Sequence, residues 1–316
     1  MRIDLHQHLL PVGLLDALRS RRQPPRVSGH SPVTLHLSGE PDGALDLTEH
    51  DPGIRVSTTP ADLIGLSLSC ALGIDQLDPA QAQPLLDLWH DGAEQLGAPF
   101  GTWVSIALVE PDLEVVRRDL LRPRALGLQL PAPALATPDD VARLGDVLAL
   151  CAELDRPVLV HPGPARIPDG ARAPSWWPAL VPYLAQQAAA WFAWHAAGVG
   201  DHPDLRIGFV ALAGLAPMHH ERLAVRGGAF RVHPNVYYET SSYSARAIDA
   251  LVRVVGVDAL VHGSDEPNAH STDPGLGEAF ARLLFATNPA RFLGGDLRDA
   301  APGGDTVNDI LKGALR

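Results

Sequence analysis

The segment Arg2-Ile-Asp-Leu-His-Gln-His8 combines the pattern of a buried strand with two histidines that stand two positions apart. Successive side chains of a strand alternate between its two faces, so residues i and i+2 project to the same side. The strand expected at Arg2–His6 therefore directs His6 and His8 toward one point near its C-terminal end. Its short, largely apolar run is typical of a parallel sheet that is covered on both faces.

Seven more apolar runs of this kind follow, and helical-looking segments separate them. The expected strands are residues 63–70, 101–107, 125–130, 157–161, 206–211, 236–240 and 259–263. The expected helical segments are residues 11–22, 79–96, 111–121, 138–154, 175–198, 217–227, 245–256 and 277–285. Eight such units predict an α/β fold, a (β/α)₈ TIM barrel, and a chain of 316 residues suits one barrel with insertions. A doubly wound open sheet is the alternative, but no GxGxxG motif follows the first strand.

We expect residues 1–316 to form a single domain with an insertion at about residues 24–58, which are rich in Pro, Gly, Asp and His. Within the insertion, Val33–Leu37 and Ala44–Leu47 flank a Gly-Glu-Pro-Asp-Gly turn and predict a small β-hairpin near the barrel mouth. A second irregular segment, residues 162–178, follows the fifth strand, where barrel loops often carry function. Its Trp176 and Trp177 either pack in the core or cover an apolar substrate.

Composition and charge exclude several classes of partner. The net charge of -12 argues against nucleic acid or an anionic membrane as the main partner. It says little about the substrate, which we expect to be a small molecule. No apolar run approaches the roughly 20 residues that span a bilayer, and no signal-peptide pattern is seen. Cys70 and Cys151 lie in apolar stretches, as buried free thiols do in a reducing compartment. We therefore expect a cytoplasmic protein.

Two further polar residues stand at the ends of expected strands. His161 ends the fifth strand, and Asp265 follows the eighth. Barrel active sites are built at the C-terminal ends of the strands, so both are expected near His6 and His8. Three imidazoles and a carboxylate suit a borderline cation such as Zn²⁺ and leave room for a water molecule, whose pKa the metal lowers to about 7. Taken singly, each residue has an ordinary alternative, such as a helix N-cap for Asp265.

The segments Asp4-Leu-His-Gln-His8 and Gly263-Ser-Asp-Glu-Pro267, with the strand-end His161, resemble the amidohydrolase superfamily. The resemblance is closest to its amidohydrolase 2 branch, which includes aminocarboxymuconate-semialdehyde decarboxylase and related aromatic-acid decarboxylases. It spans essentially the whole chain. It implies a distorted (β/α)₈ barrel with one divalent metal, Zn²⁺ first and Mn²⁺ or Fe²⁺ as alternatives. The implied ligands are His6, His8, His161 and Asp265.

The lysine content favours one metal ion rather than two. Superfamily members with two metals usually bridge them with a carboxylated lysine on the fourth strand. This chain has Gln129 in that region, and its only lysine, Lys312, lies near the C-terminus. The resemblance therefore implies a mononuclear site, and at the family level it implies a homodimer.

The sixth strand departs from the family pattern. Family members normally end this strand with a histidine before glycine, and that histidine acts on the substrate in the decarboxylases. Ala211 stands at this position here. His219 is either a replacement acid/base or an exposed helix residue, and His220 is interpreted as exposed. Arg222 matches a family arginine, with a salt bridge and a contact to a substrate carboxylate as its alternatives.

The leading functional hypothesis is a metal-dependent hydrolase of a small-molecule amide, ester or lactone. Metal-activated water would attack the carbonyl group, with Asp265 moving the proton and with His219 and Arg222 as further candidate catalytic residues. One alternative is a non-oxidative decarboxylase of an aromatic or muconate-type acid, which Ala211 disfavours because a proton donor is missing. A second alternative is a catalytically degenerate barrel that only binds a small ligand. Glu239 and Ser241, near the end of the seventh strand, are candidates to line the mouth.

Overall fold

The computed structural model describes residues 1–167, 173–270 and 273–295, so Lys312 and the rest of the tail lie outside the described residues. Eight parallel strands form one sheet in the order β1-β5-β6-β7-β8-β9-β10-β11. The last strand returns to the first through the amide of Leu5, which donates to the carbonyl of His262 over 3.0 Å, and through a parallel bridge between Gln7 and Glu266. The sheet is therefore a nearly closed barrel.

Each of the eight expected strands is present, although most are shorter than the apolar runs that predicted them. Their bounds are Ile3–Gln7 (β1), Leu63–Leu66 (β5), Phe100–Val104 (β6), Ala125–Pro131 (β7), Val158–His161 (β8), Ile207–Phe209 (β9), Val236–Glu239 (β10) and Leu260–Val261 (β11). The register is regular between β7 and β8, and a bulge lies between β1 and β5 at Asp4/Gln7. The predicted (β/α)₈ fold is confirmed.

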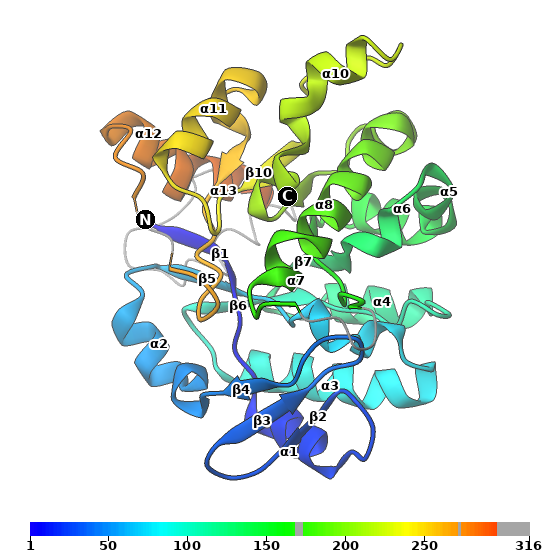
Figure 1. The fold of residues 1–316 in the computed structure, drawn as a ribbon, viewed down its shortest axis with the longest axis vertical. Helices are drawn as coiled ribbons and strands as arrows, with labels where there is room; N and C mark the ends of the chain where they lie inside the picture. The colour runs from blue at the N-terminus through cyan, green and yellow to red at the C-terminus, as the bar shows by residue number, and fades with distance from the viewer. Residues whose placement is uncertain (168–172, 271–272, 296–316) are drawn as a thin grey trace.

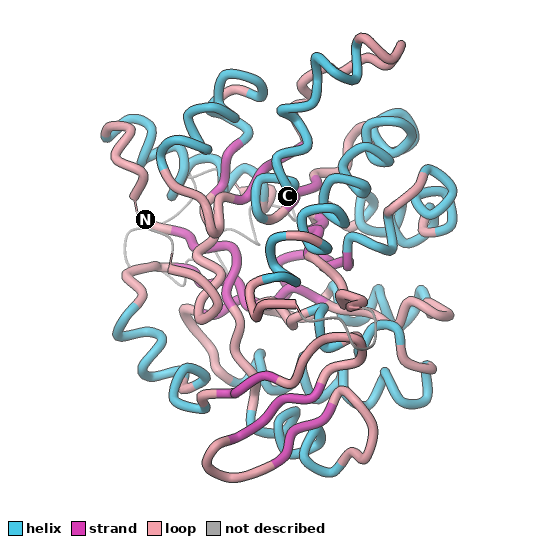
Figure 2. The backbone as a smooth tube through the Cα atoms, in the orientation of Figure 1, coloured by secondary structure: helices cyan, strands magenta, loops and turns pink. Residues whose placement is uncertain are grey.

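Helices surround the barrel, as Figures 1 and 2 show. Their bounds are Val12–Ser20 (α1), Pro79–Gln95 (α3), Leu113–Leu120 (α4), Pro138–Arg143 (α5), Gly145–Glu153 (α6), Trp177–Leu180 (α7), Pro182–Ala193 (α8), Val199–Asp201 (α9), His220–Ala224 (α10), Ala245–Val255 (α11), Glu278–Arg282 (α12) and Asn288–Phe292 (α13). Side-chain caps start several of them: Asp112 accepts from the amide of Glu114, and Thr137 forms a capping box with Asp140. None of the described helices is both long and apolar enough to cross a membrane.

The barrel interior is apolar at the end where the strands begin. Phe292 of α13 is fully buried there, with its ring centroid 5.8 Å from that of Trp103 and 5.0 Å from that of Tyr237. Gly208 leaves space for this ring, because a Cβ atom at that position would lie 2.9 Å from Phe292 Cζ. This plug leaves the opposite end of the barrel for polar groups.

The insertion between β1 and β5 is larger than the predicted hairpin. The hairpin is present as β3 (Val33–His36) and β4 (Gly43–Leu45), and β2 (Arg26–Ser28) adds a third antiparallel strand. A 3₁₀ helix (Leu47–His50) and α2 (Pro52–Thr58) complete the insertion. In Figure 1 the small sheet lies near α1 and α3, at one side of the barrel.

Candidate metal centre

Three imidazoles from opposite parts of the barrel converge at the C-terminal ends of the strands. His6 lies in β1, His8 follows it, and His161 ends β8; their exposed fractions are 1%, 6% and 7%. The Nε2 atom of His8 is 3.2 Å from Nε2 of His6 and 3.3 Å from Nε2 of His161. The ring centroids are 4.9 to 5.1 Å apart, and the ring planes are nearly perpendicular. The Nε2 atoms therefore surround one point.

Asp265 adds a carboxylate to this cluster. Its Oδ1 atom lies 3.1 Å from Nε2 of His8 and 3.8 Å from Nε2 of His6. Asp265 follows β11 with a φ of 60°, a left-handed conformation that aspartate tolerates better than most residues. Its amide donates to the carbonyl of His6 over 2.8 Å, which holds this turn against the end of β1. The structure thus brings together all four residues that the sequence singled out.

The Nδ1 atoms of two of the rings show which nitrogen is free to bind a cation. Nδ1 of His8 is 2.9 Å from the carbonyl oxygen of Ser67, and Nδ1 of His161 is 2.8 Å from that of Pro162. A carbonyl oxygen only accepts, so Nδ1 of both rings carries the proton and Nε2 presents a lone pair. These lone pairs and the Asp265 carboxylate would repel one another unless a cation lay between them.

The spacing of the donor atoms fits a divalent metal ion. With metal–nitrogen bonds of about 2.1 Å, tetrahedral or octahedral angles put neighbouring ligand atoms about 3.0 to 3.4 Å apart. The distances of 3.2, 3.3 and 3.1 Å that involve Nε2 of His8 fall in this range. One ring nitrogen from each of His6, His8 and His161 lies within 4.8 Å of the other two, close enough for all three to bind one ion.

The ionisable groups of the cluster shift one another's pKa. Burial lowers the pKa of His161, and the neighbouring His6 and His8 lower it further. Burial alone would raise the pKa of Asp265, but contact with His8 and the nearby His6 and His161 rings hold that pKa well below its ordinary value. Burial would lower the pKa of His6, yet the carboxylates of Glu239 and Asp265 raise it overall. Asp265 is therefore ionised, and His161 is neutral, as ligands of a metal must be.

Asp4 connects the first and last strands behind the ligands. Its Oδ1 atom accepts from the amides of His6 (3.2 Å) and Ser264 (3.0 Å), and its Oδ2 atom accepts from Nε2 of Gln7 (2.7 Å). The carboxylate is 1% exposed. Sequence reasoning missed this role, although a charged residue within an otherwise buried strand is a usable signal.

Arg55 of α2 connects the insertion to the same region. Its Nη1 atom donates to Oε1 of Gln7 (3.0 Å) and to the carbonyls of His8 (3.1 Å) and Glu266 (3.2 Å). Its Nη2 atom donates to the carbonyl of Glu49, and the residue is 3% exposed. The insertion is therefore held against two of the three chain segments that carry the candidate ligands. No sequence pattern pointed to Arg55.

Glu239 lies directly behind His6, with Oε2 at 3.5 Å from Nδ1 of that ring. It is fully buried, and it accepts from the amide and hydroxyl of Ser241 and from the amide of Ala211 (3.2 Å). A Cβ atom on Gly263 would lie 2.4 Å from its Oε1, so a side chain there would displace the Glu239 carboxylate. Glu239 and Ser241, expected to line the mouth, are buried behind the ligands and orient His6.

The chain after β9 forms a left-handed turn that the sequence did not predict. The expected strand ends already at Phe209, and the five residues from Ala211 to Leu215 all have φ values between 49° and 61°. Four of them are not glycine, and this conformation costs roughly 1–2 kcal/mol for each such residue. The hydrogen bond from Ala211 to Glu239 holds the turn next to the ligands, where Ala211 contributes only a methyl group.

His219 lies directly before α10, and Arg222 lies within it. Both are exposed, and among the described residues neither forms a hydrogen bond or ion pair with the four ligands. His220 is half-buried and its Nδ1 is 3.0 Å from the carbonyl of Pro217. The catalytic roles expected of His219 and Arg222 stay predictions. Trp176 and Trp177 are 54% and 39% exposed, so they do not pack in the core.

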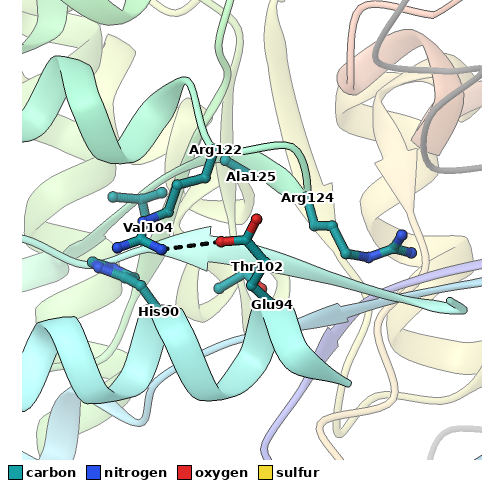
Figure 3. A pocket seen from close by; sticks show the side chains of 7 residues that line it. All are labelled: His90, Glu94, Thr102, Val104, Arg122, Arg124 and Ala125. Carbon is teal, nitrogen blue, oxygen red and sulfur yellow. Dashed lines mark hydrogen bonds and ion pairs between the residues drawn. The ribbon is translucent and has the colours of Figure 1, made fainter. Parts of the chain in front are cut away.

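Two cavities among the described residues lie outside the metal centre. Figure 3 shows one between α3, β6 and the start of β7, crossed by a 3.0 Å ion pair between Arg122 and Glu94. Its volume of about 10 Å³ holds at most one water molecule. A groove of about 180 Å³ between α3 and α4 is lined by Gln83, Ser105 and other residues outside the ligand set. Neither is part of the metal centre.

The fold and the four converging side chains define a (β/α)₈ barrel with a candidate single-metal site. No protein-family model matches the sequence, and no curated protein matches it either. Solved structures do match in fold. IDCase of Metarhizium anisopliae, in its apo form, has 19% sequence identity and a TM-score of 0.75, covering 93% of this chain and 97% of its own.

Two aromatic-acid decarboxylases match over a similar length. The 2,6-dihydroxybenzoate decarboxylase complexed with 2,6-dihydroxybenzoate has 17% identity and a TM-score of 0.68, covering 92% of this chain and 98% of its own. The 5-carboxyvanillate decarboxylase of Novosphingobium aromaticivorans, complexed with manganese, has 18% identity and a TM-score of 0.70, covering 93% and 96%. The resemblance to amidohydrolase-type barrels is thus confirmed at the level of the fold.

These relatives correct the functional expectation. Hydrolysis of an amide, ester or lactone was the leading hypothesis from the sequence, and it is wrong: several solved structures that share this fold are decarboxylases of dihydroxybenzoate or carboxyvanillate, which supports the decarboxylase alternative. The hypothesis gave too much weight to Ala211. Ala211 lacks one proton-bearing group, but the four candidate ligands still converge.

Proposed function

We propose that this protein is a metal-dependent, non-oxidative decarboxylase of an aromatic acid. One observation carries the proposal: the His6, His8, His161 and Asp265 cluster lies in a barrel whose full-length fold relatives are aromatic-acid decarboxylases. The converging donor atoms also argue against a catalytically degenerate barrel, in which these four side chains would have no reason to stay close together.

We propose one divalent metal ion, held by those four residues. Gln129 on β7 supports a single ion, because its amide nitrogen already donates to the carbonyl of Leu68 (2.6 Å) and to Sγ of Cys70 (3.1 Å). Zn²⁺ was expected from the sequence, whereas manganese is named in several of the solved relatives. The ligand set accepts either ion. When bound, the ion would act as a Lewis acid that stabilises negative charge on a substrate oxygen.

In decarboxylation the bond between the ring carbon and the carboxylate breaks, and its electron pair stays on the ring carbon. Carbon dioxide leaves, and the ring carbon takes up one proton. We propose that Asp265 carries this proton to the carbon, because its carboxylate is the acid nearest to the point where the ligands meet. Its low pKa means that it is ionised in the free site, so the proton must arrive with the substrate or from solvent.

The test is carbon dioxide release from 2,6-dihydroxybenzoate and 5-carboxyvanillate by protein loaded with Mn²⁺ or Zn²⁺. We expect release that depends on metal and falls at least about 100-fold in Asp265→Asn, as expected for loss of a proton-transferring group. Elemental analysis should find one ion per chain, and His161→Ala should lose it. Protein that holds one ion per chain but releases no carbon dioxide from a panel of aromatic acids would contradict the proposal.

We further propose that residues 1–316 act as one catalytic domain, with the insertion as part of its active site. The contacts of Arg55 support this, because they join the insertion to two of the segments that carry the candidate ligands. The proposed substrate is a small molecule. The homodimer and the cytoplasmic location expected from the sequence stay predictions, and sedimentation of the purified protein tests the first of them.

A further inference from the structure

The insertion brings an additional histidine to the end of β1. His50 is the last residue of the 3₁₀ helix Leu47–His50, and its Nδ1 atom is 3.1 Å from the amide nitrogen of Leu10. Leu10 is two residues beyond the ligand His8. Arg55 donates both to the carbonyl of Glu49, the neighbour of His50, and to the carbonyl of His8. His50 is therefore held against the segment that follows the candidate ligand His8.

The contact with Leu10 determines which ring nitrogen of His50 holds the proton. A backbone amide only donates, so Nδ1 must present its lone pair and the neutral ring carries its hydrogen on Nε2. Among the described residues, none accepts a hydrogen bond from this Nε2 atom. The residue as a whole is half-buried.

His50 is neutral at physiological pH. Burial lowers its pKa to about 4, the positive charge of Arg55 lowers it further, and Asp46 acts in the opposite direction. A neutral imidazole can still donate a strong hydrogen bond to an oxygen that gains negative charge during a reaction.

Other candidate donors near the site are already used. The Nδ1 hydrogens of His8 and His161 go to backbone carbonyls, the amide of Ala211 donates to Glu239, and the Ala211 side chain has no polar atom. The hydroxyl of Tyr183, whose pKa the Asp265 charge helps to raise, donates to the Glu40 carboxylate at 2.8 and 3.0 Å.

We propose that His50 is a catalytic residue that contacts the substrate and donates its Nε2 hydrogen to an oxygen of the aromatic acid. The assignment rests on the proposed decarboxylase function. The insertion then supplies part of the active site rather than only covering it. The hydrogen bond would strengthen as the carbon–carbon bond breaks and charge spreads onto the substrate oxygen, so it would act mainly on kcat.

Two substitutions separate this role from a structural one. His50→Asn places an amide oxygen near the position of Nδ1, so it can still accept from Leu10, but it leaves nothing at the position of Nε2. His50→Gln reaches the position of Nε2 with an amide donor and loses the contact with Leu10. His36→Asn is the matched control, because that ring contacts Ser28 and Asp42 within the small sheet.

The experiment measures kcat and KM for carbon dioxide release from 2,6-dihydroxybenzoate, calorimetric binding of 2-nitroresorcinol, metal content and Tm. We expect His50→Asn to lose about 100-fold in kcat, the effect typical of removing one oxyanion donor, with unchanged metal content and Tm. His50→Gln should keep kcat within about 10-fold and lower Tm, and binding should weaken in the Asn variant alone.

The outcomes are distinguishable. An Asn variant with wild-type kcat and binding, or a kcat loss confined to the Gln variant, would overturn the assignment while leaving the decarboxylase function intact. Wild-type protein that binds 2-nitroresorcinol without releasing carbon dioxide would contradict the proposed function. In that case weaker binding by His50→Asn than by His36→Asn would still support the contact between His50 and an aromatic ligand, and equal binding would refute it.

Discussion

The carboxylate of Asp4 accepts a hydrogen bond of 3.0 Å from the amide of Ser264, which lies 260 residues further along the chain. This contact joins the first barrel strand to the loop that carries Asp265. It closes the barrel at the level of the candidate ligands, and it makes the position of Asp265 depend on a residue of the first strand.

Replacing Asp4 by Asn should therefore weaken metal binding without removing a ligand. The Asn amide nitrogen would face donors, namely Ser264 N or Gln7 Nε2, and leave one of them unpaired. Loss of a partner of this kind typically costs about 10- to 100-fold in metal affinity. Competition with a chelator measures the effect, and exposed Asp16→Asn serves as the control. Equal metal affinity of both variants would show that Asp4 does not position the site.

Replacing Arg55 by Lys should loosen the insertion. Arg55 reaches Gln7, His8 and Glu266 with its planar guanidinium group, which a lysine ammonium lacks. Some of these buried acceptors would therefore lose their partner. We expect a loss of about 2–4 kcal/mol in the free energy of unfolding, together with a lower kcat/KM. The exposed helix pair of Arg253 and Asp249 supplies the control, since Arg253→Lys should change stability by less than about 0.5 kcal/mol. Urea unfolding of the metal-loaded protein measures both, and equal effects would contradict the buried role.

Asp75 should make stability decrease as pH rises. The residue is 5% exposed, and burial raises its pKa to about 7 from 3.8. Between about pH 4 and pH 7 the folded protein keeps a proton that the unfolded chain releases, so the free energy of unfolding falls with pH by about 4 kcal/mol in total. Relative to wild type, Asp75→Asn should gain stability through this window and level off above it.

Urea unfolding of both proteins at several pH values from 4 to 8 checks this expectation. Other titrating groups contribute equally to both proteins and cancel in the difference. A difference that stays constant with pH would mean that Asp75 has the same pKa in the folded and unfolded chains.

The left-handed turn after β9 predicts opposite effects of one chemical change at two positions. Ala211 has a φ of 49°, whereas Ala216 is fully buried and has no positive φ. Ala211→Gly should stabilise by about 0.5–1 kcal/mol, because relief of the left-handed strain exceeds the entropy cost of glycine. Ala216→Gly should destabilise by about 1–2 kcal/mol, since it loses a buried methyl group and adds chain entropy. Thermal unfolding compares the two, and destabilisation of the same size at both positions would exclude strain at Ala211.

Much of this architecture was predictable because it follows from local patterns. Short apolar runs that alternate with helical segments identify eight strands, and strands of one parallel barrel all end at the same face. His6, His8, His161 and Asp265 stand at such ends, so their convergence follows once the barrel is assumed. The functional hypothesis failed where it relied on one position, Ala211, rather than on the whole mouth.

By itself the sequence determined the alternation of strands and helices and the residue types at the strand ends. Both depend on residues that are close in sequence. Only the tertiary structure decided what surrounds the ligands. Arg55 meets Glu266, Glu239 meets His6, and His50 meets Leu10 because the closed barrel and its insertion bring distant segments together. No local pattern encodes such contacts, and the same holds for the left-handed turn, which is stable only because Glu239 and the packed interior hold it. The proposed chemistry thus combines ligands that the sequence reveals with donors that only the fold positions.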